Sequence, residues 1–158
     1  MECYYHISKR LLEVGTRLKG NGLDKIDERI EDALERAMPR SMISRRDAIF
    51  MRPVPDFTRC GVADTGYIYL VEPVGITQFH DLSWLGPMEL AQLKAKHPQL
   101  SKHADWSPDL VDRCCEGYWS GTPADQLVWE ILSSEAIVTK RLTDEPVSVD
   151  ATKGLLTL

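Results

Sequence analysis

The spacing of apolar and polar residues predicts three helices. In residues 26–38 apolar side chains recur every three or four positions, and acidic and basic side chains occupy most of the others, as in an amphipathic helix. Pro39 predicts its end. Residues 87–96 and 108–119 each begin with proline, which is favoured in the first turn of a helix.

Short apolar runs rich in β-branched and aromatic residues predict the strands. The clearest is YIYLVEPV at 67–74, and the segment ITQFHDLSWL that follows Gly75 is expected to return beside it as a hairpin. Residues 11–25 contain three glycines and are expected to form a short turn of helix and then a loop. The other predicted strands are 3–7, 48–52, 126–132 and 136–142.

This irregular order of strands and helices favours an α+β fold, with a small mixed, largely antiparallel sheet and flanking helices. A chain of 158 residues is expected to form one domain with a substantial core. We predict that the domain spans residues 1–142. The weakly patterned residues 143–158 are expected to form a C-terminal tail or an edge strand.

Charge and composition narrow the functional classes. The 24 acidic and 19 basic residues give a net charge of -5, which argues against bulk electrostatic binding to nucleic acid. A local basic face remains open, because five arginines fall within residues 40–59. The sequence shows no signal peptide and no run of about 20 apolar residues, so we expect a cytoplasmic protein without membrane contact. Its four cysteines and four histidines form no metal motif.

The most unusual position is Glu130, a carboxylate between Trp129 and Ile131 in a predicted strand. Burying such a charge costs several kcal/mol, unless the side chain faces a cleft or finds a partner. His6 lies in an aromatic strand and Arg45 precedes another strand. Each of the three has a structural explanation when taken alone: a hydrogen-bonded histidine, a solvent-facing carboxylate and a surface cation.

Other candidate residues have weaker signals. The chain contains no glycine-rich phosphate loop, serine elbow or zinc-binding helix motif. Asp81 in FHDLSW is expected to cap a turn. The tryptophans are expected to pack in the core, except that Trp119 is expected near a cleft.

Two stretches resemble the ADP-ribosyltransferase superfamily, in its compact bacterial and phage branches. YYHISKRLLEVGTRLKG is similar to the first strand and following loop of DNA-targeting ADP-ribosyltransferase toxins, and DQLVWEILSSEAI is similar to the strand that carries their catalytic glutamate. SRRDAIFMRP and GYIYLVEP resemble their middle strands, so the likeness covers about residues 4–141. It implies an ADP-ribosyltransferase-like fold, with NAD as the substrate that donates ADP-ribose.

The resemblance also implies roles for individual residues. Glu130 would be the catalytic carboxylate, and His6 would hydrogen-bond the ribose next to the nicotinamide. Tyr67 or Tyr69 would stack near the nicotinamide, and Arg45 is a candidate for binding the NAD diphosphate. A transferase of this kind predicts that His6, Arg45 and Glu130 converge on one concave pocket.

The acceptor is less defined. Val128 stands two residues before Glu130, so the acidic or amide partner found there in arginine-modifying transferases is absent. We therefore expect a nucleic acid base, in RNA or DNA, as the first choice of acceptor and a protein side chain as the second. Such an enzyme would be a toxin or act in phage defence, with an antitoxin or another protein as partner. The alternatives are NAD hydrolysis, a catalytically silent binding or inhibitory module, and an α+β protein without a cleft.

Overall fold

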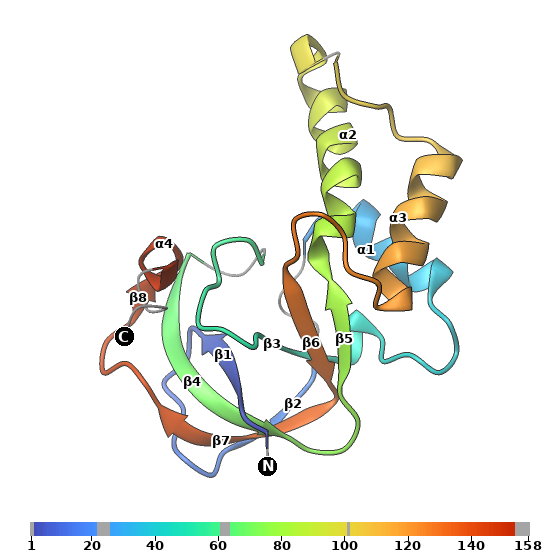
Figure 1. The fold of residues 1–158 in the computed structure, drawn as a ribbon. Helices are drawn as coiled ribbons and strands as arrows, with labels where there is room; N and C mark the ends of the chain where they lie inside the picture. Colours follow the sequence, from blue (N-terminus) through green and yellow to red (C-terminus); the bar gives the residue numbers. More distant parts are fainter. Residues whose placement is uncertain (1, 22–25, 61–63, 101, 154–158) are drawn as a thin grey trace.

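The computed structural model describes residues 2–21, 26–60, 64–100 and 102–153, which form two β-sheets and a group of helices (Figure 1). The strands are β1 (Tyr4–Ser8), β2 (Arg17–Lys19), β3 (Ile49–Met51), β4 (Thr65–Pro73), β5 (Gln78–Asp81), β6 (Trp129–Ser133), β7 (Glu135–Arg141) and β8 (Val147–Ser148). The first sheet has the order β1-β4-β7-β2, with β8 paired to β4, and the second has the order β3-β6-β5. All pairings between these strands are antiparallel.

The helices are α1 (Glu28–Ala37), α2 (Gly86–Lys96), α3 (Pro108–Ser120) and the short α4 (Val149–Thr152), with the 3₁₀ turns η1 (Arg45–Asp47), η2 (Leu82–Leu85) and η3 (Pro98–Leu100). Asp27 caps α1, because its carboxylate accepts hydrogen bonds from the backbone N–H groups of Arg29 and Ile30. The helix ends before Pro39, as predicted. α2 and α3 also begin with the prolines that predicted them. No helix in these described ranges is long and apolar enough to cross a membrane.

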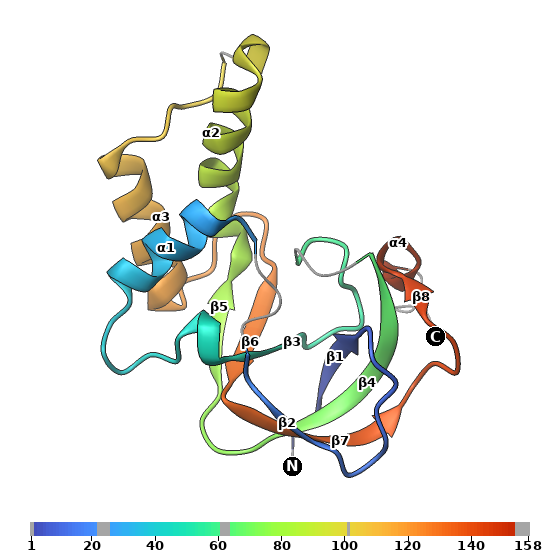
Figure 2. The same cartoon turned by 180° about the vertical axis from the view of Figure 1, so that it is seen from behind.

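The two sheets are joined at two places. β6 continues through Ser134 into β7, so that one stretch of chain passes from the second sheet to the first. Tyr5 and Arg52 exchange two backbone hydrogen bonds of 2.8 Å, which connect β1 to the end of β3. The two sheets lie side by side (Figure 2). They share a core, whose buried side chains include Met51, Tyr69, Val71, Ile131 and Val138.

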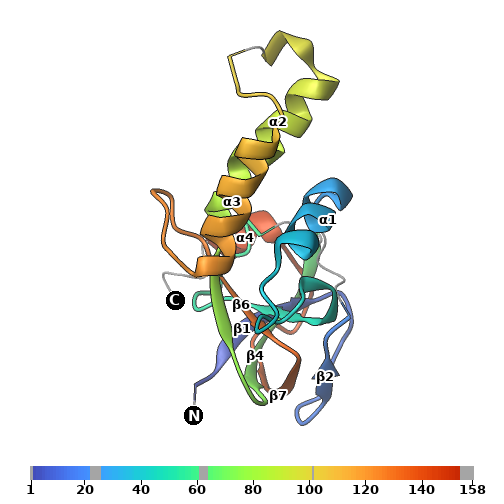
Figure 3. The same cartoon turned by 90° about the vertical axis from the view of Figure 1, so that its right-hand side faces the viewer.

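A second core lies between the second sheet and the helices. α1, α2 and α3 gather beside β5 and β6, away from the first sheet (Figure 3). The buried face of α1 meets the buried faces of α2 and α3 there, together with side chains from β3 and β6. The main contributors are Ile30, Leu34, Phe50, Leu85, Met88, Cys114, Cys115, Tyr118 and Leu132. Burial of these apolar groups fixes the helices over the face of the sheet that carries Glu130.

The α+β class and the antiparallel pairing are confirmed, but the expected hairpin after Gly75 is wrong. β5 pairs with β6 and not with β4, because the chain turns at Gly75 (φ 85°) and enters the second sheet. The expectation of a helical turn and loop in residues 11–25 is also wrong at 17–19, where β2 pairs with β7. Leu18 is buried between two exposed cations, the alternation that a strand requires. Residues 22–25 lie outside the described part.

The segment after residue 142 packs against the first sheet. β8 pairs with the beginning of β4 at Thr65 and Gly66. The buried hydroxyl of Thr152 accepts a hydrogen bond from the backbone N–H of Phe57 at 3.0 Å. The division of the chain at residue 142 stays a prediction, and residues 154–158 lie outside the described part.

Candidate functional site

Glu130 is tolerated in β6 because it has buried partners. Its side chain points from β6 toward the helices, and the residue is 3% exposed. The carboxylate Oε2 accepts a hydrogen bond of 2.6 Å from the Tyr118 hydroxyl and forms an ion pair with Nη1 of Arg45. Because a buried charge is costly without such partners, these contacts explain how the strand accommodates it.

Arg45 is the centre of a buried ion cluster, a name that we use for Glu31, Arg45, Tyr118 and Glu130. Arg45 is 2% exposed, and its Nε lies 2.9 Å from Glu31 Oε2. Its Nη2 donates to Glu31 Oε1 at 3.1 Å and its Nη1 to the Tyr118 hydroxyl at 3.0 Å. The guanidinium carbon lies 4.7 Å from the centre of the Phe50 ring. One cation thus compensates two carboxylates that come from different elements.

Electrostatics keep this cluster in a defined protonation state. Burial alone would lower the pKa of the Arg45 guanidinium, but the neighbouring charges of Glu130 and Glu31 hold it well above its usual value. Burial raises the pKa of Tyr118 well above its ordinary value, so its hydroxyl stays protonated and donates to Glu130. The cluster therefore contains a permanent cation and a permanent hydrogen-bond donor.

His80 completes the surroundings of Glu130 as its cross-strand partner on β5. Its ring stacks on that of Tyr118 with centres 4.6 Å apart, and Nδ1 lies 2.8 Å from the Tyr118 carbonyl oxygen. Because a carbonyl can only accept, Nδ1 carries the proton. Burial lowers the pKa of His80 against the effect of this hydrogen bond, and the Arg45 cation lowers it further. The imidazole is therefore neutral near pH 7.

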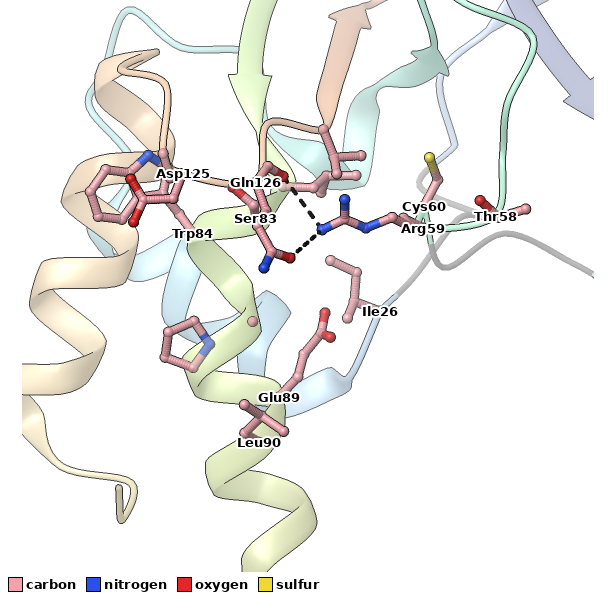
Figure 4. A pocket seen from close by; sticks show the side chains of 15 residues that line it. Ile26, Thr58, Arg59, Cys60, Ser83, Trp84, Glu89, Leu90, Asp125 and Gln126 are labelled. Carbon is pink, nitrogen blue, oxygen red and sulfur yellow. Dashed lines mark hydrogen bonds between the residues drawn. The ribbon is translucent and has the colours of Figure 1, made fainter. Parts of the chain in front are cut away.

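A cleft of about 760 Å³ is lined in part by Val128, two residues before Glu130 (Figure 4). Its walls come from four segments: Ile26 before α1, residues 58–60, η2 with the first turns of α2, and the loop 124–128 that leads into β6. Its size falls within the range of small-molecule sites. The lining residues are Ile26, Thr58, Arg59, Cys60, Leu82, Ser83, Trp84, Gly86, Pro87, Glu89, Leu90, Ala124, Asp125, Gln126 and Val128.

The cleft walls carry groups of both charges. Arg59 projects into the space from one side, and Glu89 and Asp125 lie on the others (Figure 4). Glu89 is exposed to the open cleft. Partial loss of solvation beside the cleft walls, and then the charge of Asp27, raise the pKa of its carboxyl. Trp84 lines the cleft instead of the expected Trp119, which is buried.

Asp81 connects two of these walls. The residue is fully buried, and its Oδ1 accepts hydrogen bonds from the Ser83 N–H at 3.0 Å and the Val128 N–H at 2.9 Å. Its Oδ2 accepts from the Ala124 N–H at 2.7 Å. These bonds outweigh burial and lower the pKa of the Asp81 carboxyl. The expected capping role is confirmed, and the same carboxylate also holds the loop before β6.

A small inner gap of about 10 Å³ lies between the cleft and Glu130. Cys60 and Leu82 line both spaces, so these two side chains separate Glu130 from the cleft. Burial raises the pKa of the Cys60 thiol to about 11, which leaves it unreactive near neutral pH. The gap is lined by Ile7, Phe50, Met51, Arg52, Phe57, Cys60, Leu82 and Glu130.

The structure brings only some of the predicted site residues together. Arg45 contacts Glu130 directly, but it lines neither the cleft nor the inner gap. His6 lies on the opposite side of β3, where Nδ1 is 2.8 Å from the Phe50 carbonyl oxygen, and burial lowers its pKa against that bond. Of His6, Arg45 and Glu130, only Glu130 lines one of these two described cavities.

The two tyrosines have structural contacts. Tyr69 is fully buried, and its hydroxyl accepts from the Leu12 N–H at 2.8 Å and donates to the Arg10 carbonyl at 3.1 Å. Tyr67 is half-buried and packs against the core shared by the two sheets. Neither tyrosine lines the cleft or the inner gap.

Comparisons with protein-family models, with curated proteins and with solved structures find no match for this chain. Within residues 2–21, 26–60, 64–100 and 102–153, no group of three histidine, cysteine or acidic side chains could hold a metal ion.

Proposed function

We propose that this chain is an ADP-ribosyltransferase that binds NAD in the cleft and uses Glu130 as its catalytic carboxylate. We also propose an ADP-ribosyltransferase-like fold. This is supported by the likeness of the first strand and of the Glu130 strand to that superfamily. The observation that carries the assignment is the place of Glu130, a carboxylate in the wall of a gap that adjoins a cleft of about 760 Å³.

The proposed reaction breaks the bond between the ribose C1′ and the nicotinamide nitrogen. The bonding electrons leave with nicotinamide, positive charge develops on the ribose, and a nucleophile of the acceptor then bonds to C1′ and releases its proton to solvent. A carboxylate held in a fixed position stabilises that charge. Arg45 and Tyr118 both bind Oε2 of Glu130 and so orient the carboxylate. On this account Arg45 is a positioning residue for Glu130.

Access to Glu130 requires a local rearrangement. Cys60 and Leu82 lie between the cleft and the inner gap, so the ribose reaches Glu130 only when these two side chains move apart. Rotamer changes of this kind are common when ligands and partners bind. The acceptor remains a nucleic acid base as first choice and a protein side chain as second.

The test is consumption of NAD and transfer of label from it. Wild-type protein and Glu130→Gln are incubated with isotope-labelled NAD and, separately, with RNA, DNA and protein acceptors. We expect transfer by the wild type and a loss of kcat of roughly 100-fold or more in Glu130→Gln, with NAD binding retained. Glu116→Gln, an exposed change on α3, is the matched control and should keep full activity.

A catalytically silent binding module is the second candidate, and one observation favours it. The Glu130 carboxylate is paired with a buried cation and a phenol, contacts that also suit a purely structural ion cluster. Calorimetry separates the candidates: binding of NAD without turnover by the wild type supports the module, and turnover without any acceptor identifies NAD hydrolysis.

A further inference from the structure

Trp84 is the one aromatic side chain among the described residues that line the cleft. Tyr67 and Tyr69, the aromatic residues expected to stack on a ligand, line neither of the two described cavities. An aromatic side chain in a cleft wall offers a flat surface on which a planar group of a ligand can stack. Trp84 is therefore the candidate for contact with such a group.

The indole of Trp84 packs against the backbone of α3 at Gly117. A Cβ added to Gly117 would lie 2.2 Å from Cδ2 of Trp84 and 2.5 Å from both Cε2 and Cε3. Cδ2 is bonded to the other two atoms at the junction of the indole rings, so Gly117 lies against a face of the indole and not against its edge. Glycine permits this close approach of the backbone.

A hydrogen bond fixes the orientation of the same indole. Its Nε1 donates to the carbonyl oxygen of Thr122 at 2.6 Å. Trp84 is nevertheless only half-buried and lines the cleft, so part of the indole surface meets the cleft. A side chain that is already fixed loses little conformational entropy when a ligand binds to it. Trp84 is thus a preformed surface for stacking.

The neighbouring carboxylate favours a ring that carries an amino group. Asp125 lines the same cleft and lies three residues after Thr122, whose carbonyl holds Trp84. Carboxylate oxygens accept hydrogen bonds, so they favour a ring with an exocyclic amino group over one with a carbonyl oxygen in the same place. Adenine carries this amino group, whereas hypoxanthine carries the carbonyl oxygen.

The position of Trp84 distinguishes the two rings of NAD. Trp84 and Cys60 lie on opposite sides of the cleft (Figure 4). Cys60 marks the boundary between the cleft and the inner gap, which Glu130 lines. In the proposed reaction the ribose next to the nicotinamide reaches this boundary. The adenine at the other end of NAD therefore extends along the cleft toward Trp84.

We propose that Trp84 stacks on the adenine ring of the ligand, and that Asp125 accepts a hydrogen bond from the adenine amino group. For NAD this inference rests on the proposed function, in which C1′ meets Glu130 at the other side of the cleft. The stacking does not require turnover, so adenosine alone is a sufficient probe. Trp84 and Asp125 then determine which base the cleft accepts.

The experiment measures binding of adenosine by calorimetry to wild type, Trp84→Leu, Trp84→Phe and the control Trp106→Leu. Trp106 is also half-buried and packs against the same helical core, but it lines neither cavity. We expect a roughly tenfold or larger loss of affinity in Trp84→Leu, because the stacking surface is removed. Trp84→Phe keeps a ring and should retain most of the affinity. Trp106→Leu should bind like the wild type.

Two further readouts do not depend on the stability of the variants. Adenosine should quench the tryptophan fluorescence of the wild type, and this quenching should disappear in Trp84→Phe although calorimetry still shows binding. The wild type should bind adenosine more tightly than inosine, whose base is hypoxanthine. Asp125→Ala, a change at an exposed position, should remove this difference.

The outcomes separate this inference from the proposed function. Equal adenosine affinity in wild type and folded Trp84→Leu, or no adenosine binding by the wild type, would overturn the adenine site. Adenosine binding that depends on Trp84 without NAD consumption supports the adenine site and counts against the transferase. NAD consumption with an unchanged KM in Trp84→Leu supports the transferase and overturns the role of Trp84. Tighter binding of nicotinamide riboside than of adenosine through Trp84 would overturn the assignment to adenine.

Discussion

Replacement of Arg45 by methionine should destabilise the protein strongly. Methionine fills a similar volume but removes the cation that compensates Glu31 and Glu130, both of which are buried. Tyr118 continues to donate to Glu130, whereas Glu31 loses three hydrogen bonds from the guanidinium. Breaking a buried ion pair by removing one partner costs about 3–5 kcal/mol. Since two carboxylates are affected, we expect the loss at the upper end of this range.

The assay is urea denaturation and thermal denaturation of wild type and Arg45→Met, both followed by far-ultraviolet circular dichroism. A loss of this size lowers the melting temperature by on the order of 10 °C in a chain of this length. Arg46→Met is the matched control, because Arg46 is the exposed neighbour on the same turn and should change stability little. Addition of Glu31→Gln and Glu130→Gln to Arg45→Met should recover part of the loss. A loss below about 1 kcal/mol in Arg45→Met would refute the buried ion cluster as described.

Three further predictions concern packing, pH and thiol reactivity. Gly117→Ala should cost about 1–3 kcal/mol in urea denaturation, because the new Cβ would lie 2.2 Å from a ring carbon of Trp84, which also lines the cleft. Burial lowers the pKa of His80 below 6.5, so as the pH falls the unfolded state binds the His80 proton before the folded state does. The wild type should therefore lose more stability between pH 7.5 and 5.5 than His80→Phe does. Iodoacetamide at pH 7.5 should modify the exposed Cys3 and spare Cys60 in the folded protein, as read by mass spectrometry.

Matched controls make these predictions specific. Gly86→Ala meets no atom within 4 Å and should cost much less than Gly117→Ala, and equal costs would contradict the packing at Trp84. His97→Phe changes an exposed histidine and should leave the pH dependence of the wild type intact. A pH dependence that His80→Phe does not alter would exclude a buried neutral His80. Rapid alkylation of Cys60 in the folded state would show that the boundary between the cleft and the inner gap opens often.

Local patterns predict the parts of the fold that depend on local interactions. The apolar face of α1, its capping residue and its end at Pro39 all follow from neighbouring residues in the sequence. The partner of β5 does not follow from neighbouring residues. The turn at Gly75 is compatible with pairing to β4 or to β6, and the pairing with β6 depends on the second sheet as a whole. β2 also escapes prediction, since three residues are too few for a periodic signal.

The candidate site shows the same limit. Glu130 and Arg45 are each recognisable in the sequence, one as a charge in a strand and the other as a cation before a strand. Their contact is not predictable, because 85 residues separate them along the chain. Glu31 and Tyr118 were not among the predicted site residues, although Glu31 borders the apolar face of α1 and Tyr118 lies on the buried face of α3. The cleft is formed by four segments that are distant in the sequence, so no single motif marks it.

The most direct test of the central claim is NAD turnover by wild type, Glu130→Gln and Glu116→Gln at a temperature at which melting curves show that all three are folded. The account predicts transfer of labelled ADP-ribose by the wild type and by Glu116→Gln, and a loss of kcat of roughly 100-fold or more in Glu130→Gln with NAD binding retained. Absence of both NAD binding and turnover in the folded wild type would contradict it, and Glu130 would then have only its structural role in the buried ion cluster.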